Sequence, residues 1–363
     1  MNQELLYQEA AAAYPFGSDI QSIEPYGGGH INDTFLIKCP DNEYVLQRIN
    51  GYVFKHPDEI MENILGVTQF IADKLAARGE DPARKTLTVV QTTDGNNSYV
   101  DSAGNYWRVT LNIKGTTAYE YADSPEMLVK SGAAFGSFQS MLADYPADTL
   151  HETIPHFHDT PARYQQLEDA VAANAAGRLG EVEAELAFAR ARKADCSILM
   201  DLLEKGELPL KVTHNDTKMS NVLIDDKTGE AVCVIDLDTV MPGLTAFDFG
   251  DSIRAGATTA AEDEVDLTKV HFSLELFKAY TEGFLREAGA ALTETEIKTL
   301  PVGAKLMTLE VGMRFLADYL NGDVYFKTKY PQHNLDRARN QFRLVEEMEQ
   351  KWDGMMEIVG AYL

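Results

Sequence analysis

The sequence predicts an α+β fold of two lobes, a small antiparallel sheet followed by a larger helical region. Between residues 20 and 112, short runs alternate apolar and polar residues and are separated by turn-forming residues, which is the pattern of strands. From residue 124 onward, apolar residues instead recur every three to four positions, as on one face of a helix. Because the pattern changes near residue 115, we expect the lobes to span residues 1–113 and 114–363.

The composition is that of an ordinary globular protein with a strong acidic surplus. Of the 363 residues, 45% are hydrophobic and 25% are charged, and the formal net charge is −25. Such a surface repels phosphate backbones and anionic lipids, so neither nucleic acid nor a membrane is expected as a partner, and no protein partner is evident. The three cysteines are widely spaced and no apolar run approaches the ~20 residues of a membrane span. Because no secretion signal is visible either, we expect a cytoplasmic location.

The first elements are predicted to be a helix and three strands. Residues 2–14 predict a short helix, residues 23–37 two strands joined by a turn of three glycines, and residues 43–50 a third strand. Glycines in such a turn let backbone amides approach a phosphate group. Protein kinases carry a phosphate-pairing lysine in their third strand, whereas this chain carries Gln47. The sequence leaves open which cation replaces that lysine.

An amphipathic helix is predicted over residues 57–77. Its apolar face consists of Ile60, Ile64, Val67, Ile71 and Leu75. Glu59 and Glu62 are candidates for the ion pair that this helix makes in kinases, although a solvated acidic face explains them equally well. Three further strands are expected at residues 87–91, 98–101 and 106–111.

The remaining chain is predicted to be mainly helical. Helices are expected at residues 124–145, at 162–205 as two helices, and at 266–288, 293–321 and 334–361. Three histidines cluster at residues 151–158, but no second ligand cluster has the spacing of a zinc site. Asp159 is better explained as a helix N-cap.

The stretch 213–221 (THNDTKMSN), followed by an apolar run that ends on Asp236, has the residues of a phosphoryl-transfer site. Such a site needs a carboxylate, here Asp216, that takes the proton of an attacking hydroxyl, and a cation, here Lys218, that meets the transferred phosphoryl group. Asn221 and Asp236 would supply oxygen ligands to Mg²⁺. Any one of these residues could be an ordinary turn former, so the prediction depends on the whole set.

The spacing of these residues is that of the kinase pattern H-R-D-x-x-x-x-N. Asp216 precedes Asn221 by five residues, and Asn221 precedes Asp236 by fifteen. Residues 222–225 and 231–235 predict two strands joined by a tight turn. An antiparallel hairpin would bring its two ends together, so residues fifteen apart could share one metal ion.

The letters D-F-G also occur, at residues 248–250, but do not predict the magnesium site. They lie 32 residues after Asp216 and no predicted strand ends on them. Asp248 or Asp251 is expected to cap a helix or to hold the loop.

Glu310, Arg314 and Asp318 fall on one face of the helix predicted at residues 293–321. Periodicity alone favours an ion-pair stripe there.

Six segments resemble the N-acetylhexosamine 1-kinases of bifidobacterial type, within the aminoglycoside phosphotransferase-like superfamily. They are residues 23–32 (IEPYGGGHIN), 154–161 (IPHFHDTP), 212–218 (VTHNDTK), 246–254 (AFDFGDSIR), 313–320 (MRFLADYL) and 329–335 (KYPQHNL). The resemblance runs over nearly the whole chain. It implies a two-lobed, protein-kinase-like fold and an ATP- and Mg²⁺-dependent kinase that phosphorylates the anomeric hydroxyl of N-acetylglucosamine or N-acetylgalactosamine.

The resemblance also implies roles for individual residues. Asp216 would be the catalytic base, and His30, Arg314 and Tyr325 would contact the sugar, which replaces the ion-pair stripe as the expectation for Arg314. The nucleotide-binding residues are expected to be Gly28, Gly29, Asn32 and Gln47, and glutamine at position 47 is a trait of the subgroup.

Two alternatives remain open. One is a related kinase with another alcohol acceptor, such as choline, methylthioribose or an aminoglycoside, since an acidic protein suits a cationic acceptor. The other is a nucleotide-binding protein without catalysis, which the presence of Asp216, Lys218, Asn221 and Asp236 disfavours. The choice between the two N-acetylhexosamines does not follow from these motifs.

Overall fold

The computed structural model describes residues 3–16, 19–27 and 31–363, which form two compact units. The first unit contains Met1–Thr117, Asp148–Ile154 and Leu223–Met241, and the second contains Ala118–Ala147, Pro155–Val222 and Pro242–Leu363. The predicted division after residue 113 lies close to the first break between the units. Two later segments of the chain also belong to the first unit, which a division at one position does not anticipate.

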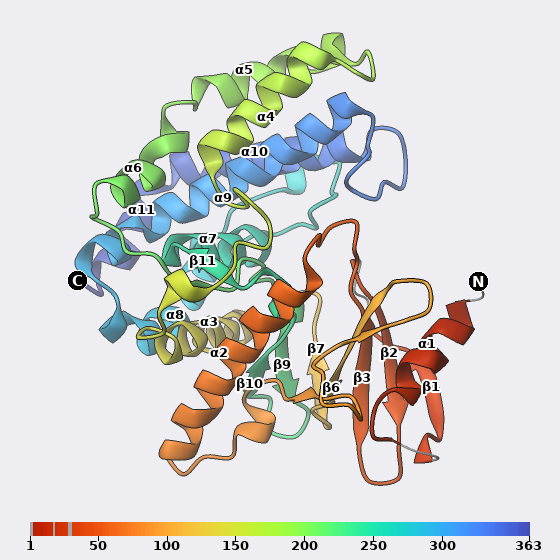
Figure 1. Cartoon of the computed structure of the whole chain (residues 1–363). Coiled ribbons are helices and arrows are strands. Elements are labelled where there is room, and N and C mark those ends of the chain that lie inside the picture. Colours follow the sequence, from red (N-terminus) through yellow and green to blue (C-terminus); the bar gives the residue numbers. More distant parts are fainter. Residues whose placement is uncertain (1–2, 17–18, 28–30) are drawn as a thin grey trace. The chain divides into compact units, whose positions relative to one another are not determined.

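The first unit is built on an antiparallel sheet, as predicted (Figure 1). Its strands are β1 (Ser22–Pro25), β2 (Asp33–Lys38), β3 (Glu43–Arg48), β4 (Val89–Val90), β5 (Tyr99–Val100) and β6 (Tyr106–Leu111). The described strands follow the order β1-β2-β3-β6-β4, and β5 also pairs with β6. The two strands expected at residues 87–91 and 98–101 are thus present but only two residues long.

Helix α1 (Gln3–Ala12) forms an apolar core with one face of this sheet. Phe35 lies opposite Leu46, and Leu46 lies opposite Val109, so one row of buried side chains crosses three strands. Tyr14, which follows the helix, donates a hydrogen bond of 3.0 Å to the carbonyl of Trp107. Side chains alternate across a strand, so the neighbouring row must point to the other face of the sheet.

Helix α2 (Pro57–Ala77) has the bounds that the sequence predicts. Its periodic apolar residues are all buried, because the 3.6-residue pattern places them on one face. Asn63, also buried, donates to the carbonyls of His151 and Val240 at 2.9 Å each. These bonds help to explain why residues 148–154 and 223–241 belong to the first unit.

The predicted hairpin is confirmed as β9 (Val222–Asp225) and β10 (Ala231–Val234). The two strands are neighbours in a three-stranded sheet with β7 (Thr116–Ala118), which the sequence analysis did not anticipate. Asp226 donates its backbone N–H to the carbonyl of Gly115 at 3.0 Å. This bond connects the turn between β9 and β10 to the residue before β7. A two-stranded sheet joins β8 (Lys211–Thr213) and β11 (Met241–Gly243).

The second unit is mainly helical. Its helices are α3 (Pro125–Met141), α4 (Thr160–Ala173), α5 (Glu183–Ala191), α6 (Ile198–Glu204), α7 (Thr245–Gly256), α8 (Leu274–Ala288), α9 (Glu294–Asn321), α10 (His333–Gln350) and α11 (Trp352–Gly360). Asp159 caps α4 by accepting the N–H of Ala162, as expected. A capping box of Thr293 and Glu296 starts α9.

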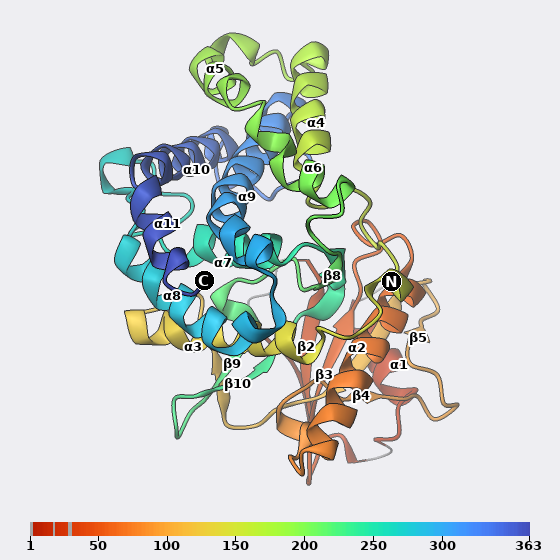
Figure 2. The same ribbon diagram turned by 90° about the vertical axis from the view of Figure 1, so that its left-hand side faces the viewer.

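The long helix α9 packs against α4, α7 and α10 (Figures 1 and 2). Gly250 of α7 and Gly303 of α9 meet at close quarters: a Cβ on Gly250 would lie 2.4 Å from the Gly303 carbonyl oxygen. Only glycine lets the two backbones approach this closely. The contact fixes α7, whose first two turns carry Asp248 and Asp251.

Three helix predictions are wrong in detail. Residues 162–205 form three helices, with Asn174 in the left-handed conformation at the end of α4. Residues 266–273 are not part of α8, which starts after the cap Ser273. Residues 334–361 divide at Lys351, whose ammonium donates to the carbonyl of Phe272 at 2.5 Å and so serves a tertiary contact.

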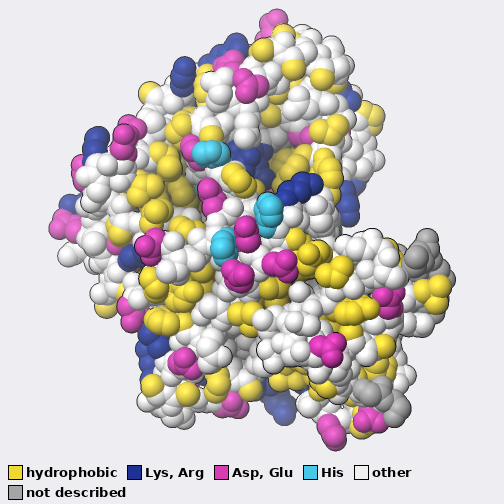
Figure 3. All heavy atoms as spheres, viewed as in Figure 1, with side chains coloured by type: hydrophobic (Ala, Val, Ile, Leu, Met, Phe, Trp, Pro, Cys, Tyr) yellow, Lys and Arg dark blue, Asp and Glu magenta, His cyan; other side chains and the backbone are white. Residues whose placement is uncertain are grey.

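None of the helices in the described part of the chain has both the length and the apolar composition of a membrane span. On the face shown in Figure 3, acidic side chains are spread widely with basic ones between them, as expected for a net charge of −25.

Candidate functional site

The loop after β8 is held by α7. Asp248 accepts the backbone N–H groups of His214 and Asn215, at 2.9 and 2.7 Å, and Asp251 accepts that of Thr217 at 2.8 Å. Burial raises the pKa of Asp248. The charge of His214 and the hydrogen bonds from amide N–H groups offset this increase only in part. The two aspartates therefore hold the loop, as the sequence analysis allowed.

Asp216 lies at the centre of this loop, and its carboxylate accepts hydrogen bonds from two side chains. Its Oδ2 accepts from Lys218 Nζ at 2.9 Å and from Asn221 Nδ2 at 3.1 Å. Burial acts to raise the pKa of Asp216, but Lys218, then His214 and Asn221, outweigh burial and lower it. The carboxylate is thus ionised at neutral pH, as a proton acceptor must be. The structure brings together three of the predicted residues, Asp216, Lys218 and Asn221.

The predicted magnesium ligands have the donor chemistry that Mg²⁺ prefers. The amide nitrogen of Asn221 donates a hydrogen bond of 2.8 Å to the backbone carbonyl of Asp216. The amide oxygen of Asn221 accepts no hydrogen bond from the described residues. Asp236 lies in the left-handed conformation (φ 61°, ψ 56°) at the start of the turn η7 (Leu237–Thr239). Such backbone strain in a non-glycine residue occurs preferentially at functional sites. A carboxylate and an amide oxygen fit Mg²⁺; that both bind one ion stays a prediction.

The histidines of residues 151–158 do not converge. His151 contacts Glu62 at 2.6 Å, and His158 contacts Glu310 at 2.9 Å. Among the residues that the structure covers, no group of three or more His, Cys, Asp or Glu side chains is arranged to hold a metal. Because Glu62 is used by His151, the kinase-type ion pair expected from Glu59 or Glu62 is not made by Glu62, and Glu59 forms none with any described residue.

Four polar residues of the first unit form a second cluster. Gln47 accepts from Arg108 Nε and Nη2, at 3.1 and 2.9 Å, and Arg108 is ion-paired with Asp238. Asn32 donates to Asp238 at 2.6 Å. Two predicted nucleotide residues, Asn32 and Gln47, therefore belong to one network. The others, Gly28 and Gly29, lie outside the described residues, as does the predicted sugar residue His30.

Sequence reasoning missed Arg108 and Asp238. A signal for each was present: Arg108 is the charged residue of a mainly apolar strand, and Asp238 follows Asp236 by two positions. A buried charge requires a partner, so a basic residue in such a strand indicates a carboxylate elsewhere in the chain.

Arg314 lies among aromatic rings on the second unit. Its guanidinium carbon is 5.3, 5.9 and 5.7 Å from the ring centres of Phe157, Tyr325 and Phe326. No carboxylate or carbonyl of the described chain pairs with it. The ion-pair stripe that periodicity favours is therefore wrong. The structure does bring the predicted residues Arg314 and Tyr325 together.

Glu310, which precedes Arg314 by one turn of α9, is paired with other residues. Glu310 binds His158 at 2.9 Å and Thr160 at 2.9 Å, both through its buried carboxylate. The other ring nitrogen of His158 contacts the carbonyl of Asn215 at 3.1 Å. A continuous set of contacts thus links the residue next to Asp216 with the turn of α9 that precedes Arg314.

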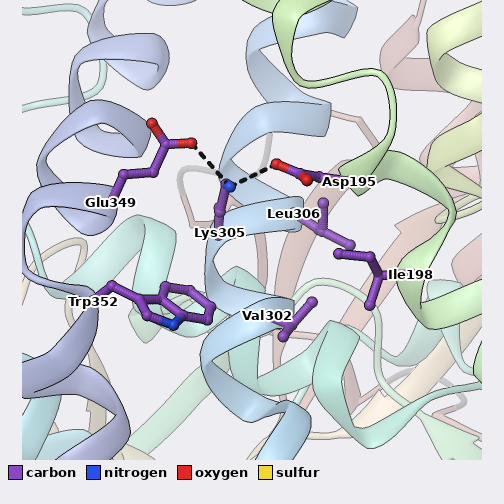
Figure 4. Close-up of a pocket in the computed structure, with 7 residues that line it drawn as sticks. All are labelled: Asp195, Ile198, Val302, Lys305, Leu306, Glu349 and Trp352. Carbon is purple, nitrogen blue, oxygen red and sulfur yellow. Dashed lines mark hydrogen bonds and ion pairs between the residues drawn. The ribbon is translucent and has the colours of Figure 1, made fainter.

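A separate cavity of about 400 Å³ lies on the second unit (Figure 4). It is lined by Asp195, Ile198, Val302, Lys305, Leu306, Glu349 and Trp352. Lys305 donates to Asp195 at 2.7 Å and is ion-paired with Glu349 at 2.9 Å, so its charge is neutralised within the protein. None of the predicted site residues lines this cavity.

Comparison with known proteins is consistent with this geometry. A family model described as a phosphotransferase enzyme family matches residues 22–288, about three quarters of the chain, including Asp216, Asn221 and Asp236.

Three solved structures with a similar fold are distant in sequence. A microcompartment-associated aminopropanol kinase has a TM-score of 0.65 at 18% identity, covering 96% of this chain and 98% of its own. An aminoglycoside phosphotransferase from Alicyclobacillus acidocaldarius has a TM-score of 0.62 at 15% identity, with 98% and 96% covered. A choline/ethanolamine kinase family protein from Mesorhizobium loti has a TM-score of 0.54 at 17% identity, with 96% of each chain covered. At these identities the likeness concerns the fold.

Proposed function

The chain belongs to the phosphotransferase enzyme family, and from this premise we propose that it is an ATP- and Mg²⁺-dependent kinase of N-acetylhexosamines. The product would be the sugar 1-phosphate, formed by transfer of the γ-phosphoryl group to the anomeric hydroxyl. The observation that carries the acceptor class is the environment of Arg314, and the observation that carries the chemistry is the environment of Asp216.

Asp216 is the general base of the proposed reaction. Its carboxylate is ionised and oriented by Lys218 and Asn221, so it can accept the proton of the acceptor hydroxyl. Lys218 would meet the negative charge of the transferred phosphoryl group. Asn221 and Asp236 would hold Mg²⁺, which neutralises charge on the nucleotide phosphates when it is bound.

The surroundings of Arg314 favour a neutral acceptor over a cationic one. An aromatic cluster can bind a quaternary ammonium such as choline, but here the chain's own guanidinium lies against the three rings. A second cation is close by: burial, and then the charge of Arg314, lower the pKa of Arg163. Two guanidinium groups would repel choline or an aminoglycoside.

A neutral sugar matches the groups that remain available. The donors of Arg314 have no partner in the described chain, and they can bond hydroxyl or amide oxygens. Tyr325, half exposed, offers an apolar ring and a hydroxyl. A site built to bond one polar group rejects analogues that leave its own groups unpaired. The acetamido sugars should therefore exceed glucose and galactose in kcat/KM.

The test is a side-by-side assay with ATP and Mg²⁺. N-acetylglucosamine, N-acetylgalactosamine, glucose, galactose, choline and kanamycin are compared, and phosphorus NMR locates the new phosphate. We expect an N-acetylhexosamine 1-phosphate. A 6-phosphate product, or preference for choline or kanamycin, would refute the proposal.

The same assay tests a nucleotide-binding protein without catalysis. The Asp216→Asn variant serves as the background, and ATP turnover by the wild-type protein no higher than this background with all six acceptors would show that the protein is not a kinase.

A further inference from the structure

The sheet of the first unit carries a row of polar side chains on the face away from α1. Thr34 lies opposite Gln47, and Gln47 lies opposite Arg108 in the antiparallel register. These residues alternate with the apolar row of Phe35, Leu46 and Val109 that packs with α1. The row is hydrogen-bonded: Gln47 donates to Thr34 Oγ1 at 3.2 Å and accepts two bonds from Arg108.

Arg108 is a buried cation with an incomplete set of partners. Its residue is only 3% exposed. Nε and Nη2 are bound by the single side-chain oxygen of Gln47. The third nitrogen, Nη1, is ion-paired with Oδ1 of Asp238, yet neither atom forms a hydrogen bond with any described residue. The ion pair balances the two charges, but Nη1 donates no hydrogen bond in it, so its N–H groups can still bind an acceptor.

Asp238 joins this row to two neighbouring segments. Its Oδ2 accepts from Asn32 Nδ2 at 2.6 Å, and Asn32 in turn accepts the N–H of Asn50 at 3.0 Å. Asn32 follows the glycine-rich turn, and Asp238 follows the predicted magnesium ligand Asp236 by two residues. The strand cation, the segment after the glycine turn and the metal-binding segment thus meet at one carboxylate.

A kinase needs a cation at this place. The lysine of the third strand normally pairs with the α- and β-phosphates and with a glutamate of the following helix. In this chain the third strand carries Gln47 in place of that lysine, and Glu62 of α2 is paired with His151. Arg108 lies directly opposite Gln47 on the adjacent strand, and the amide oxygen of Gln47 holds its guanidinium in place.

We propose that Arg108 binds the nucleotide phosphates in place of the strand lysine, with Asp238 as its counter-ion when no nucleotide is present. This inference rests on the proposed use of ATP. A guanidinium presents several donors in one plane and binds phosphate oxygens through two parallel hydrogen bonds. Phosphate oxygens would give Nη1 the hydrogen bond that Asp238 does not provide. When Arg108 binds phosphate and releases Asp238, the carboxylate of Asp238 keeps its hydrogen bond from Asn32.

The experiment compares the binding of ADP and adenosine by calorimetry, in EDTA, so that the metal site does not contribute. Replacing Arg108 alone would leave Asp238 buried and unpaired, so the main variant is the charge-balanced Arg108→Met/Asp238→Asn. A melting curve verifies that it is folded. We expect ADP affinity to fall at least ~10-fold while adenosine affinity is unchanged, because hydrogen bonds to charged groups are lost only for the phosphates.

A matched control removes another arginine–aspartate pair of the same sheet. Arg48 of β3 is ion-paired with Asp33 of β2, and each of the two side chains is about one third exposed. Neither residue belongs to the polar row. The double variant Arg48→Met/Asp33→Asn should bind ADP as the wild-type protein does.

The single variant Asp238→Asn separates phosphate binding from a merely structural role. It leaves Arg108 buried without its counter-ion, so ADP should raise the melting temperature of this variant more than that of the wild-type protein. A structural role predicts equal increases.

Each outcome decides the inference. Equal ADP affinity of the wild-type protein and the folded Arg108→Met/Asp238→Asn variant would overturn it, as would equal ADP-induced shifts for Asp238→Asn. A wild-type protein that does not bind ADP would overturn it together with the proposed function. Normal ADP binding by the wild-type protein without phosphorylation of any N-acetylhexosamine would refute only the proposed acceptor.

Discussion

At the scale of single residues, two aspartates of the same site differ because of their partners. Asp216 has a cation within hydrogen-bond distance, and its pKa is lowered although its side chain is partly buried. Asp248 has amide donors only, and burial raises its pKa. The first can serve as a base, whereas the second holds the loop that carries the first. The residue type is the same, so the surroundings decide the role.

Replacing Asp216 by asparagine should remove the proton acceptor and little else. General-base catalysis contributes about 10²–10⁴-fold, so kcat should fall by at least ~10² while the KM for ATP changes little. Steady-state kinetics measure both. Asp201→Asn, on the exposed face of α6, is the control and should behave as the wild-type protein. Near-normal kcat for Asp216→Asn would remove this residue from the mechanism.

Asp236 and Asp248 should differ in their effect on the magnesium requirement. Asp236→Asn removes a charged oxygen ligand, so more Mg²⁺ should be needed for half-maximal activity. Asp248→Asn weakens the support of the loop and should lower kcat at every Mg²⁺ concentration without changing that requirement. The assignment is wrong if only Asp248→Asn raises the Mg²⁺ requirement.

At the scale of elements, the end of α9 and the loop after it form one structural unit. The helix ends at Gly322 in the left-handed conformation. The buried carboxylate of Asp318 then accepts the backbone N–H groups of Val324, Tyr325 and Phe326, at 3.0, 2.9 and 2.9 Å. Val324 and Tyr325 are exposed at the tip of this loop, and the hydrogen bonds to Asp318 hold the backbone of the loop in place. This holds the Tyr325 ring next to Arg314.

Asp318→Asn should weaken acceptor binding through this loop. An amide in place of the carboxylate directs its own N–H groups at backbone donors, so the loop loses support. We expect the acceptor KM to rise about 10-fold, with kcat and the KM for ATP nearly unchanged, as steady-state kinetics would show.

The matched control is Asp323→Asn in the same loop. It removes the ion pair with Arg178 but keeps the bonds that Asp318 accepts, and asparagine tolerates the left-handed conformation of this position. It should lower the melting temperature without raising the acceptor KM. Equal acceptor KM values for Asp318→Asn and Asp323→Asn would contradict the positioning role.

At the scale of the whole molecule, the acidic surplus makes stability depend on how carboxylates are paired. Glu347 is buried and binds His271 at 2.7 Å, the N–H of Phe272 at 2.9 Å and Lys351 at 2.9 Å. Burial acts to raise its pKa, but these partners, led by Lys351, lower it to about 2. The folded pKa lies below the unfolded value, so the stabilisation is complete above pH ~4.5 and is lost as the pH falls toward 2.

Glu347→Gln should therefore destabilise the protein in a pH-dependent way. We expect the free energy of unfolding to fall by on the order of 2–3 kcal/mol at pH 7, with the difference from the wild-type protein shrinking between pH 4.5 and 2. Denaturation curves at several pH values measure this. The neighbouring, half-exposed Glu346 pairs only with Arg343, so Glu346→Gln should have a small effect. A difference that does not vary with pH would refute the pairing argument.

The sequence alone determined the local elements and the arrangement of residues 213–221. Helix α2 has its predicted bounds because Pro57 and a regular apolar period act within the segment. The set Asp216, Lys218 and Asn221 was predicted because all three lie on one short loop, where spacing along the chain limits spacing in space.

Only the tertiary structure decided which distant polar groups meet. Arg108 and Asp238 are 130 positions apart, and no local pattern relates them. Periodicity placed Glu310, Arg314 and Asp318 on one helical face and suggested ion pairs. The packing of α9 gave each acid a different partner and left the guanidinium among aromatic rings. Periodicity shows which side chains are buried, but the partner of a buried polar group depends on the segment that packs against it.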